Sequence, residues 1–312
     1  MSMHALPDVT GAVPLPDLAR ERFGGAASGS PALRWLRRFG AHPRMTIGGA
    51  IIVIVSLLAL LAPWIAQNPP EVQNPLMRLA PPSSESGYWL GGDSFGRDTF
   101  SRLVYAGRVS LSVGLLSMLI TVVVGVAVGA IAGYYGGWAD RILMRITDVV
   151  LVIPTFFLLI LTVATFGRSI GLLIVVIGLT SWPINAKVVR GEIMRLRNRD
   201  YVTASRVTGA SDGWIVVRHL LPQLIPIVIA SATIRVANNI LIESGLSYLG
   251  LGVQPPTPTW GNMVTEGADF MRQAWWLVGI PGAAIFIVVL AFNLFGEGLR
   301  DFLDPRTRKG AA

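Results

Sequence analysis

Six apolar stretches, each long enough to cross a bilayer, constrain the fold of this chain more than any other feature. A hydrocarbon core about 30 Å thick needs about 20 helical residues, because each residue rises about 1.5 Å. Lipid offers no partner to unpaired backbone groups, and the alternating pattern of barrel strands is not visible. The chain is 52% hydrophobic and 14% charged. The sequence therefore predicts an all-α polytopic membrane protein, with six transmembrane helices at approximately 46–66, 109–135, 146–166, 169–186, 224–246 and 274–296.

The distribution of Arg and Lys predicts the orientation of these spans, because cytoplasmic loops retain basic residues. If the N-terminus is inside, nineteen basic residues lie in cytoplasmic segments, six lie in extracytoplasmic segments, and Arg235 lies within a span. Both termini are therefore expected in the cytoplasm. Residues 187–223 then form the largest cytoplasmic loop.

The spans divide the chain into four segments. Residues 1–44 are rich in Pro, Gly and Ala and are expected to be a disordered cytoplasmic tail. Residues 45–108 hold the first transmembrane helix, an extracytoplasmic loop and an interfacial helix, and residues 109–304 hold the other five transmembrane helices with the large cytoplasmic loop. Residues 305–312 are expected to be a cytoplasmic C-terminal tail.

Composition and motifs argue against several classes of function. The chain has no cysteine and three scattered histidines, so neither a disulfide framework nor a metal site is expected. It has no phosphate-binding loop of an ATPase, no nucleophile–base pattern and no compact carboxylate pair, so catalytic residues are not expected. The net charge of +8 does not indicate nucleic-acid binding, because a helical unit held between two spans cannot readily enter a major groove. We expect a non-enzymatic membrane protein without a cofactor of its own.

The largest cytoplasmic loop has the pattern of two helices joined at a glycine. Residues 188–208 carry apolar side chains at rough helical spacing, and Gly209 suits the left-handed conformation that ends a helix. A second helix, capped by Ser211 or Asp212, is expected to stop before Pro222, because proline has no backbone donor and disfavours helix in the preceding residue. From the residues alone, a solvated basic loop held by anionic lipid is the simplest interpretation.

The stretch DYVTASRVTGASDGWIVVRHLLPQ resembles the cytoplasmic signature of ABC importer permeases, which has Glu-Ala-Ala, three residues, Gly and a later Leu-Pro. Ala204 and Gly209 match this pattern, whereas Thr203 replaces the glutamate and with it any ion pair that the glutamate makes. In the family this element is the coupling helix, which sits in a cleft of the ATPase subunit. The resemblance implies that the ATPase-coupling residues are Thr203, Ala204, Ser205, Gly209, Ala210, Ser211, Asp212, Leu221 and Pro222.

Two further stretches resemble the second permease of dipeptide, oligopeptide and nickel importers. They are LGGDSFGRDTFSRLVYAGRVSLSVG at 90–114 and ESGLSYLGLGVQPPTPTWGNM at 243–263, and with the loop they cover residues 90–304 almost continuously. The resemblance implies the type I ABC importer permease fold in a bacterial plasma membrane. The implied partners are a homologous second permease in a heterodimer, two ATPase subunits or a fused ATPase that bind ATP and Mg, an extracytoplasmic substrate-binding protein, and membrane lipid.

The resemblance implies small peptides as cargo, with nickel or another small solute as the alternative in the same class. A stand-alone secondary transporter or channel is an alternative of a different class, although the internal repeats that such proteins often show are not visible here. A membrane scaffold that holds partners through its tail and basic loop is a third interpretation. Neighbouring genes for an ATPase and a binding protein would favour the importer.

Polar residues inside the fifth span are candidates for the translocation path. A charge at mid-bilayer costs about 2.5–3.5 kcal/mol on insertion scales, so such residues should face protein or water. Arg235, Asn239 and Glu243 follow one another at intervals of four and share one helix face. We expect this face either to line the translocation path or to pair with a neighbouring span.

Two features are expected on the extracytoplasmic side. Residues 97–108 have apolar side chains on one side and charges on the other, which predicts an amphipathic helix on the outer interface, either receiving the binding protein or only resting on the membrane. Pro255, Pro256 and Pro258 favour a stiff extended segment after the fifth span.

Small residues and prolines within the spans predict how the helices pack and bend. Gly125, Gly129 and Gly133 recur every four residues and allow another helix to approach closely. Packing within this chain is favoured over a dedicated dimer seam. Pro154 and Pro281 fall inside spans, where we expect static bends rather than hinges.

Overall fold

The computed structural model describes residues 42–83 and 87–303, and the regular secondary structure of these residues is helical, without any strand. The predicted tails at 1–44 and 305–312 lie outside this part of the chain, except that the first described helix already begins at Pro43. The α-helices are α3 (Pro43–Leu60), α4 (Ala62–Ile65), α5 (Thr99–Tyr135), α6 (Gly137–Val152), α7 (Thr155–Phe166), α8 (Ile170–Leu196), α9 (Asp200–Val207), α10 (Asp212–Ile215), α11 (Leu221–Tyr248), α12 (Trp260–Ala268) and α13 (Trp276–Leu303). A 3₁₀ turn at Pro75–Met77 and a π-helical turn at Val216–Leu220 complete the helical elements of the described residues.

Within the described residues, five helices are long and apolar enough to cross a membrane, or up to six if the bent pair α6 and α7 forms one span. The prediction of one continuous helix over 146–166 is wrong, because α6 and α7 meet at an angle of 80°. Ile153 at the break has extended backbone with ψ 118°. Pro154 follows it and has no N–H to continue the ladder. The proline therefore breaks the helix more sharply than the static bend that we predicted.

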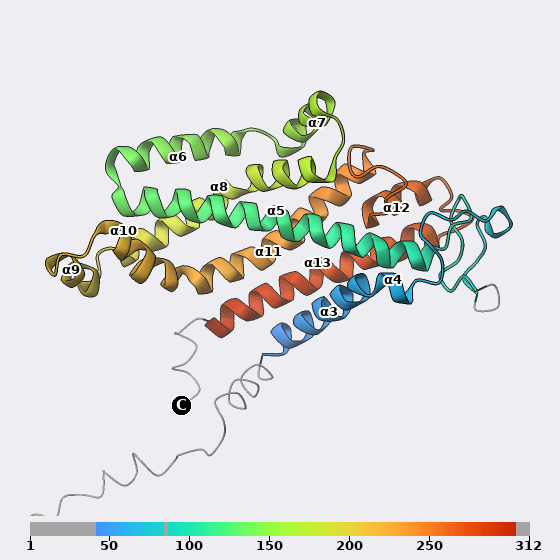
Figure 1. The fold of residues 1–312 in the computed structure, drawn as a ribbon, viewed down its shortest axis with the longest axis horizontal. Coiled ribbons are helices and arrows are strands. Elements are labelled where there is room, and N and C mark those ends of the chain that lie inside the picture. Colours follow the sequence, from blue (N-terminus) through green and yellow to red (C-terminus); the bar gives the residue numbers. More distant parts are fainter. Residues whose placement is uncertain (1–41, 84–86, 304–312) are drawn as a thin grey trace, which may run out of the picture. The chain divides into compact units, whose positions relative to one another are not determined.

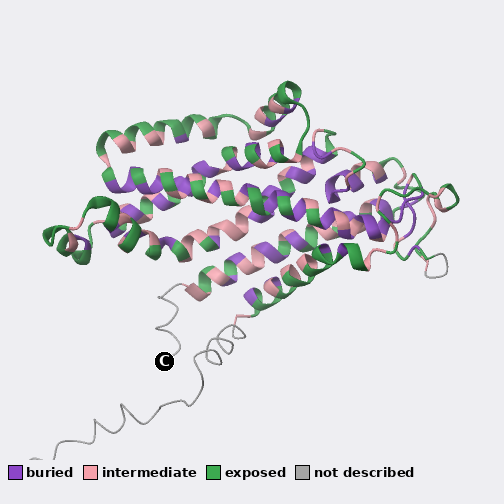
Figure 2. Ribbon diagram, in the orientation of Figure 1, coloured by how far each residue is buried: buried purple, intermediate pink, exposed green. Residues whose placement is uncertain are grey.

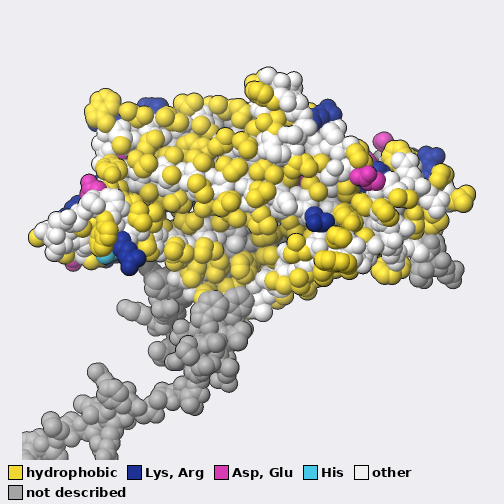
Figure 3. Space-filling view, in the orientation of Figure 1, with side chains coloured by type: hydrophobic (Ala, Val, Ile, Leu, Met, Phe, Trp, Pro, Cys, Tyr) yellow, Lys and Arg dark blue, Asp and Glu magenta, His cyan; other side chains and the backbone are white. Residues whose placement is uncertain are grey.

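The long helices lie side by side, with α5 at the centre in contact with α8, α11 and α3 (Figure 1). The helices α9 and α10 lie at one end of this bundle, the α9 end, and α12 lies with residues 66–83 and 87–98 at the other, the α12 end (Figure 1). Buried residues follow the sides on which the helices face one another (Figure 2). Hydrophobic side chains cover most of the face seen in Figure 3, and the charged side chains on it lie mostly toward the two ends. This distribution suits a bundle whose middle is surrounded by lipid.

The glycine stripe of α5 faces α8. A Cβ atom added at Gly129 would lie 2.5 Å from the carbonyl oxygen of Ala186, and one at Gly133 would lie 2.8 Å from that of Arg190. No side chain fits in these gaps, so the two backbones touch directly. The prediction that the stripe serves packing within this chain is confirmed.

A separate interfacial helix at 97–108 is not present, because α5 runs without interruption from Thr99 to Tyr135. The Asp98 carboxylate caps its start by accepting hydrogen bonds from the backbone N–H groups of Phe100 (3.1 Å) and Ser101 (3.2 Å). The charged residues that were expected to face water are buried, with Arg97 4% and Arg102 1% exposed. The prediction failed because one of the two carboxylates that pair with these charges, Glu266, lies far away in the sequence, on α12.

Candidate functional site

The α9 end contains the segment that we predicted to couple the chain to an ATPase. Helix α8 runs on to Leu196, and a turn over 197–199 separates it from α9, so the single helix predicted over 188–208 is interrupted. The turn has a clear cause, because the Arg197 guanidinium donates hydrogen bonds to the carbonyl oxygens of Gly133 (2.9 Å) and Tyr134 (3.2 Å) at the end of α5. These carbonyls have no partner within their own helix, and a cation is favourable there.

Gly209 adopts the left-handed conformation that the sequence predicted, with φ +85°. It separates α9 from α10, and Ser211 occupies the N-cap position of α10 in extended backbone. We refer to residues 200–215, which comprise α9, Gly209 and α10, as the α9–α10 segment.

Pro222 does not stop the second helix, contrary to our prediction. Leu221 begins α11 and Pro222 follows in its first turn, where a missing N–H costs nothing within the helix. The π-helical turn at Val216–Leu220 widens the backbone just before the proline and leads α10 directly into α11. The amide of Gln223 donates a hydrogen bond to the carbonyl oxygen of His219 (3.1 Å) at this irregular turn. The Leu-Pro pair therefore lies within a long helix rather than at its end.

The α9–α10 segment is anchored on one side and open on the other. Val202 and Ile215 are fully buried and belong to a core cluster that includes Tyr134 of α5 and Ile193 of α8. In contrast, Val207 is 83% exposed. A hollow on the open side is lined by Ser205, Thr208, Gly209, Ala210, Ser211 and Trp214. Six of the predicted coupling residues, Thr203, Ala204, Ser205, Gly209, Ala210 and Ser211, therefore lie on or beside this open surface.

Polar contacts tie the segment to the end of α5. The Tyr134 hydroxyl donates a hydrogen bond to Oδ1 of Asp212 (2.5 Å), and the Arg206 guanidinium lies 5.4 Å from the centre of the Tyr134 ring. The Tyr134 hydroxyl, and to a smaller extent the Asp212 carboxylate, raise the pKa of Arg206, so its charge is retained at any physiological pH. No local pattern in the sequence marks Tyr134, because its hydrogen-bond partner Asp212 lies 78 positions later.

The polar residues of the fifth span contact α5. Asn239 and Glu243 are fully buried. Oε1 of Glu243 accepts a hydrogen bond from the Ser247 hydroxyl (2.7 Å), and the Ser110 hydroxyl on α5 lies 3.4 Å from Oε2. For Asn239 and Glu243 these contacts favour pairing with a neighbouring span over an open path. Arg235 is only partly buried, and its place at the translocation path stays a prediction.

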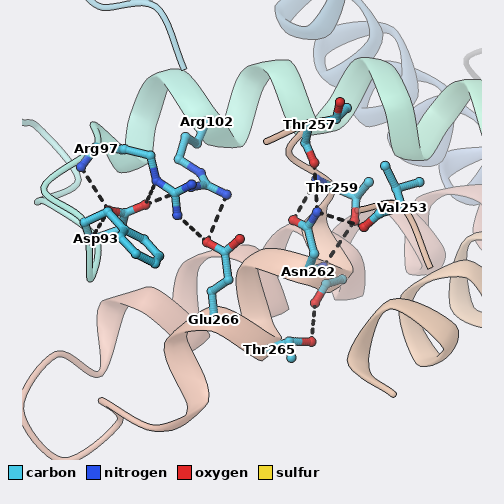
Figure 4. Close-up of polar contacts among 11 residues, drawn as sticks. Asp93, Arg97, Arg102, Val253, Thr257, Thr259, Asn262, Thr265 and Glu266 are labelled. Carbon is cyan, nitrogen blue, oxygen red and sulfur yellow. Dashed lines mark hydrogen bonds and ion pairs between the residues drawn. The ribbon is translucent and has the colours of Figure 1, made fainter. Parts of the chain in front are cut away.

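A cluster of four charges lies at the α12 end, and we call it the outer charge cluster (Figure 4); Asp93, Arg97 and Arg102 are buried and Glu266 is partly buried. The Arg97 guanidinium lies 2.5 Å from both Oδ2 of Asp93 and Oε2 of Glu266, and the Arg102 guanidinium lies 2.9 Å and 3.0 Å from the same two oxygens. Two arginines thus face two carboxylates. The cluster joins the loop before α5 to α12, which is more than 160 residues later. The only signal of this cluster in the sequence was a run of charges beside an apolar span. That run did not indicate that Arg97 and Arg102 pair with Glu266.

The chain between α11 and α12 turns back on itself instead of forming the stiff extended segment that we predicted. It contains a cis peptide bond between Pro255 and Pro256. The Asn262 amide donates hydrogen bonds to the carbonyl oxygens of Val253 (3.3 Å) and Thr257 (2.8 Å), which holds the turn against α12 (Figure 4). Thr259 and Asn262 form a capping box at the start of α12.

No group of three or more His, Asp or Glu side chains is arranged to hold a metal ion anywhere in residues 42–83 and 87–303. The described site therefore consists of an exposed helical segment, its anchors in the bundle and its polar ties to α5. Such a surface can bind another protein and transmit its movement to the long helices.

Comparison with family models gives two matches. Residues 125–309 match the binding-protein-dependent transport system inner membrane component. Residues 30–82 match the N-terminal transmembrane domain of oligopeptide transport permease C.

Individual proteins are similar over most of the chain. A di/tripeptide transport system permease protein of Pseudomonas aeruginosa is 38% identical over 287 residues, which are 90% of this chain and 94% of that protein. A dipeptide transport system permease protein of Haemophilus influenzae is 40% identical, over 84% of this chain and 90% of that protein. A glutathione transport system permease protein of Pectobacterium atrosepticum is 38% identical, over 89% of this chain and 92% of that protein.

Among solved structures, an inward-facing MetNI methionine ABC transporter contains a chain with a similar fold. Its TM-score is 0.54 at 20% sequence identity, and the match covers 65% of this chain and 97% of that chain. At this identity the likeness supports the arrangement of the helices alone. It confirms the fold class that we predicted.

Proposed function

The chain belongs to the family of binding-protein-dependent transport system inner membrane components and is a permease subunit of an ABC importer, and on this premise we propose that it forms half of a translocation path for small peptides. A homologous second permease supplies the other half, and two ATPase subunits or one fused ATPase bind ATP and Mg. An extracytoplasmic binding protein delivers the peptide. In this proposal the α9 end and both termini lie in the cytoplasm, as the excess of basic residues predicts.

The observation that carries the coupling part of this proposal is the form of the α9–α10 segment. It is anchored by Val202 and Ile215, yet it leaves Val207 and Trp214 exposed at the end of the bundle. Solvent-exposed apolar side chains next to a hollow are typical of a surface that meets another protein. Closure of the ATPase on ATP pushes on this surface. The long helices then shift between two states for which the ATPase has different affinities.

Peptides are the proposed cargo because relatives that are 38–40% identical over most of the chain are named as peptide permeases. The test is transport by the complete importer in proteoliposomes. Accumulation of a labelled dipeptide that requires both ATP and the binding protein is the expected result. Uptake of nickel without dipeptide uptake would refute the cargo, and dipeptide uptake that persists without the ATPase would refute the importer mechanism.

Gly209→Val is expected to uncouple ATP hydrolysis from uptake, lowering the amount of peptide transported per ATP at least about tenfold. The left-handed conformation costs about 1–2 kcal/mol for a residue with a side chain, and more for a β-branched one. An added Cβ at Gly209 meets no atom within 4 Å, so the effect comes from the backbone alone. The measurement is uptake and ATP hydrolysis in the same proteoliposomes.

Gly209→Asn is the matched control, because asparagine tolerates the left-handed conformation. It should retain most of the coupling. If Gly209→Val transports as much peptide per ATP as the unaltered chain, the role of Gly209 as the joint between α9 and α10 is refuted.

A further inference from the structure

We infer that Tyr134 is a positioning residue that transmits movement of the α9–α10 segment to α5 through its hydrogen bond to Asp212. The inference rests on the proposed coupling role of this segment. It adds a specific contact, outside the α9–α10 segment, through which movement enters the transmembrane bundle.

Tyr134 is a residue of α5 that contacts three different parts of the chain at the α9 end. It is the penultimate residue of α5 and is 5% exposed. Its hydroxyl bonds the first residue of α10, Asp212, and its ring faces the guanidinium of Arg206 on α9. Its carbonyl oxygen accepts from Arg197, in the turn between α8 and α9. Arg197 before α9, Arg206 in α9 and Asp212 at the start of α10 thus all contact Tyr134, through either its side chain or its backbone.

Asp212 is well placed to sense movement about Gly209. It lies three residues after that glycine and begins α10. A push on the α9–α10 segment that displaces α10 moves Asp212 relative to the end of α5, and a charge-assisted hydrogen bond resists such separation more strongly than a neutral one. Van der Waals contacts alone would allow the segment to slide over the end of α5.

From Tyr134 the movement has a direct route into the bundle. Gly133, the preceding residue, already touches the backbone of α8, and so do Gly129 and Gly125 further along α5. Since no side chains lie between these backbones, α5 and α8 are expected to move as one unit. A push at Asp212 would then displace two spans together rather than one.

The test uses the complete importer in proteoliposomes with its binding protein, and compares Tyr134→Phe with Tyr135→Phe. Tyr134→Phe keeps the buried ring and removes only the hydroxyl. We expect peptide transported per ATP to fall about tenfold, the size of effect that losing one hydrogen bond to a charged group produces. Cross-linking to the ATPase should be unchanged. Tyr135 is 59% exposed, and its variant should transport as the unaltered chain does.

If Tyr134→Phe assembles poorly, two variants of Asp212 test the inference instead. Asp212→Asn keeps an oxygen that accepts from the Tyr134 hydroxyl and should retain at least about half of the peptide transported per ATP, whereas Asp212→Leu should lose about tenfold. In the Tyr134→Phe/Asp212→Leu double variant, the loss of peptide transported per ATP should be no larger than in either single variant. An unchanged ratio in Tyr134→Phe, or additive losses in the double variant, would overturn the inference. A wild-type chain that never binds an ATPase would instead refute the proposed function.

Discussion

Arg102→Ala should be the most damaging single substitution outside the α9 end, lowering the free energy of unfolding by about 3–5 kcal/mol. Arg102 is 1% exposed and pairs with both Asp93 and Glu266. Removing one partner of a buried ion pair leaves the other charge without compensation in a medium of low dielectric constant. Arg97 alone would then face two carboxylates. The thermal midpoint and the yield of the purified assembly measure the loss.

The matched control is Arg78→Ala, in the same outer region. The Arg78 side chain donates a hydrogen bond to the carbonyl oxygen of Ser94 (3.1 Å) but lies at an exposed position. Its loss should change the unfolding free energy by less than about 1 kcal/mol. Equal midpoints for the two variants would show that the outer charge cluster does not hold α12 against α5.

Gly129→Ala should destabilise the chain by about 1–3 kcal/mol, although alanine normally favours a helix over glycine. The added Cβ would lie 2.5 Å from the Ala186 carbonyl oxygen and 2.8 Å from the Val189 Cβ. Neither α5 nor α8 can yield without separating along a shared seam, so overpacking outweighs helix propensity. The measurement is the thermal midpoint of the purified assembly, together with resistance to protease.

Gly191→Ala is expected to have the opposite sign. Gly191 lies in α8 with no atom within 4 Å of an added Cβ, so the substitution should stabilise by about 0.5–1 kcal/mol through helix propensity. If Gly129→Ala left the thermal midpoint unchanged, the direct contact between the backbones of α5 and α8 at this residue would be refuted.

The features that the sequence predicted correctly are those that depend on neighbouring residues. The length of the apolar stretches located the long helices. The glycine at position 209 predicted a left-handed backbone there. The glycine stripe of α5 predicted close helix packing because its spacing of four residues lies within a single helix. Each of these patterns has its physical cause within a single helix or a single turn of the chain.

One error arose because the cause lies elsewhere in the chain, and another because a local irregularity of the backbone is not visible in the sequence pattern. Residues 97–108 have the charge pattern of an interfacial helix, but Glu266 on α12 draws Arg97 and Arg102 into the interior. Pro222 looked like a helix stop, but the π-helical turn before it lets the helix continue. Asn239 and Glu243 are not an error of this kind, because the sequence left open whether their helix face lines a path or pairs with a neighbouring span; the position of α5 shows that these two side chains are buried.

Site-directed cross-linking shows whether an ATPase subunit contacts the α9–α10 segment, on which the proposed coupling depends. The chain has no native cysteine, so a single cysteine can be introduced at an exposed position without further changes. Val207 is 83% exposed in the α9–α10 segment, and Leu76 is 93% exposed at the α12 end. Val207→Cys is expected to form an adduct with the ATPase in membranes containing the assembled importer, and Leu76→Cys is not. An actively transporting importer in which Val207→Cys gives no ATPase adduct, with or without ATP, would contradict this contact.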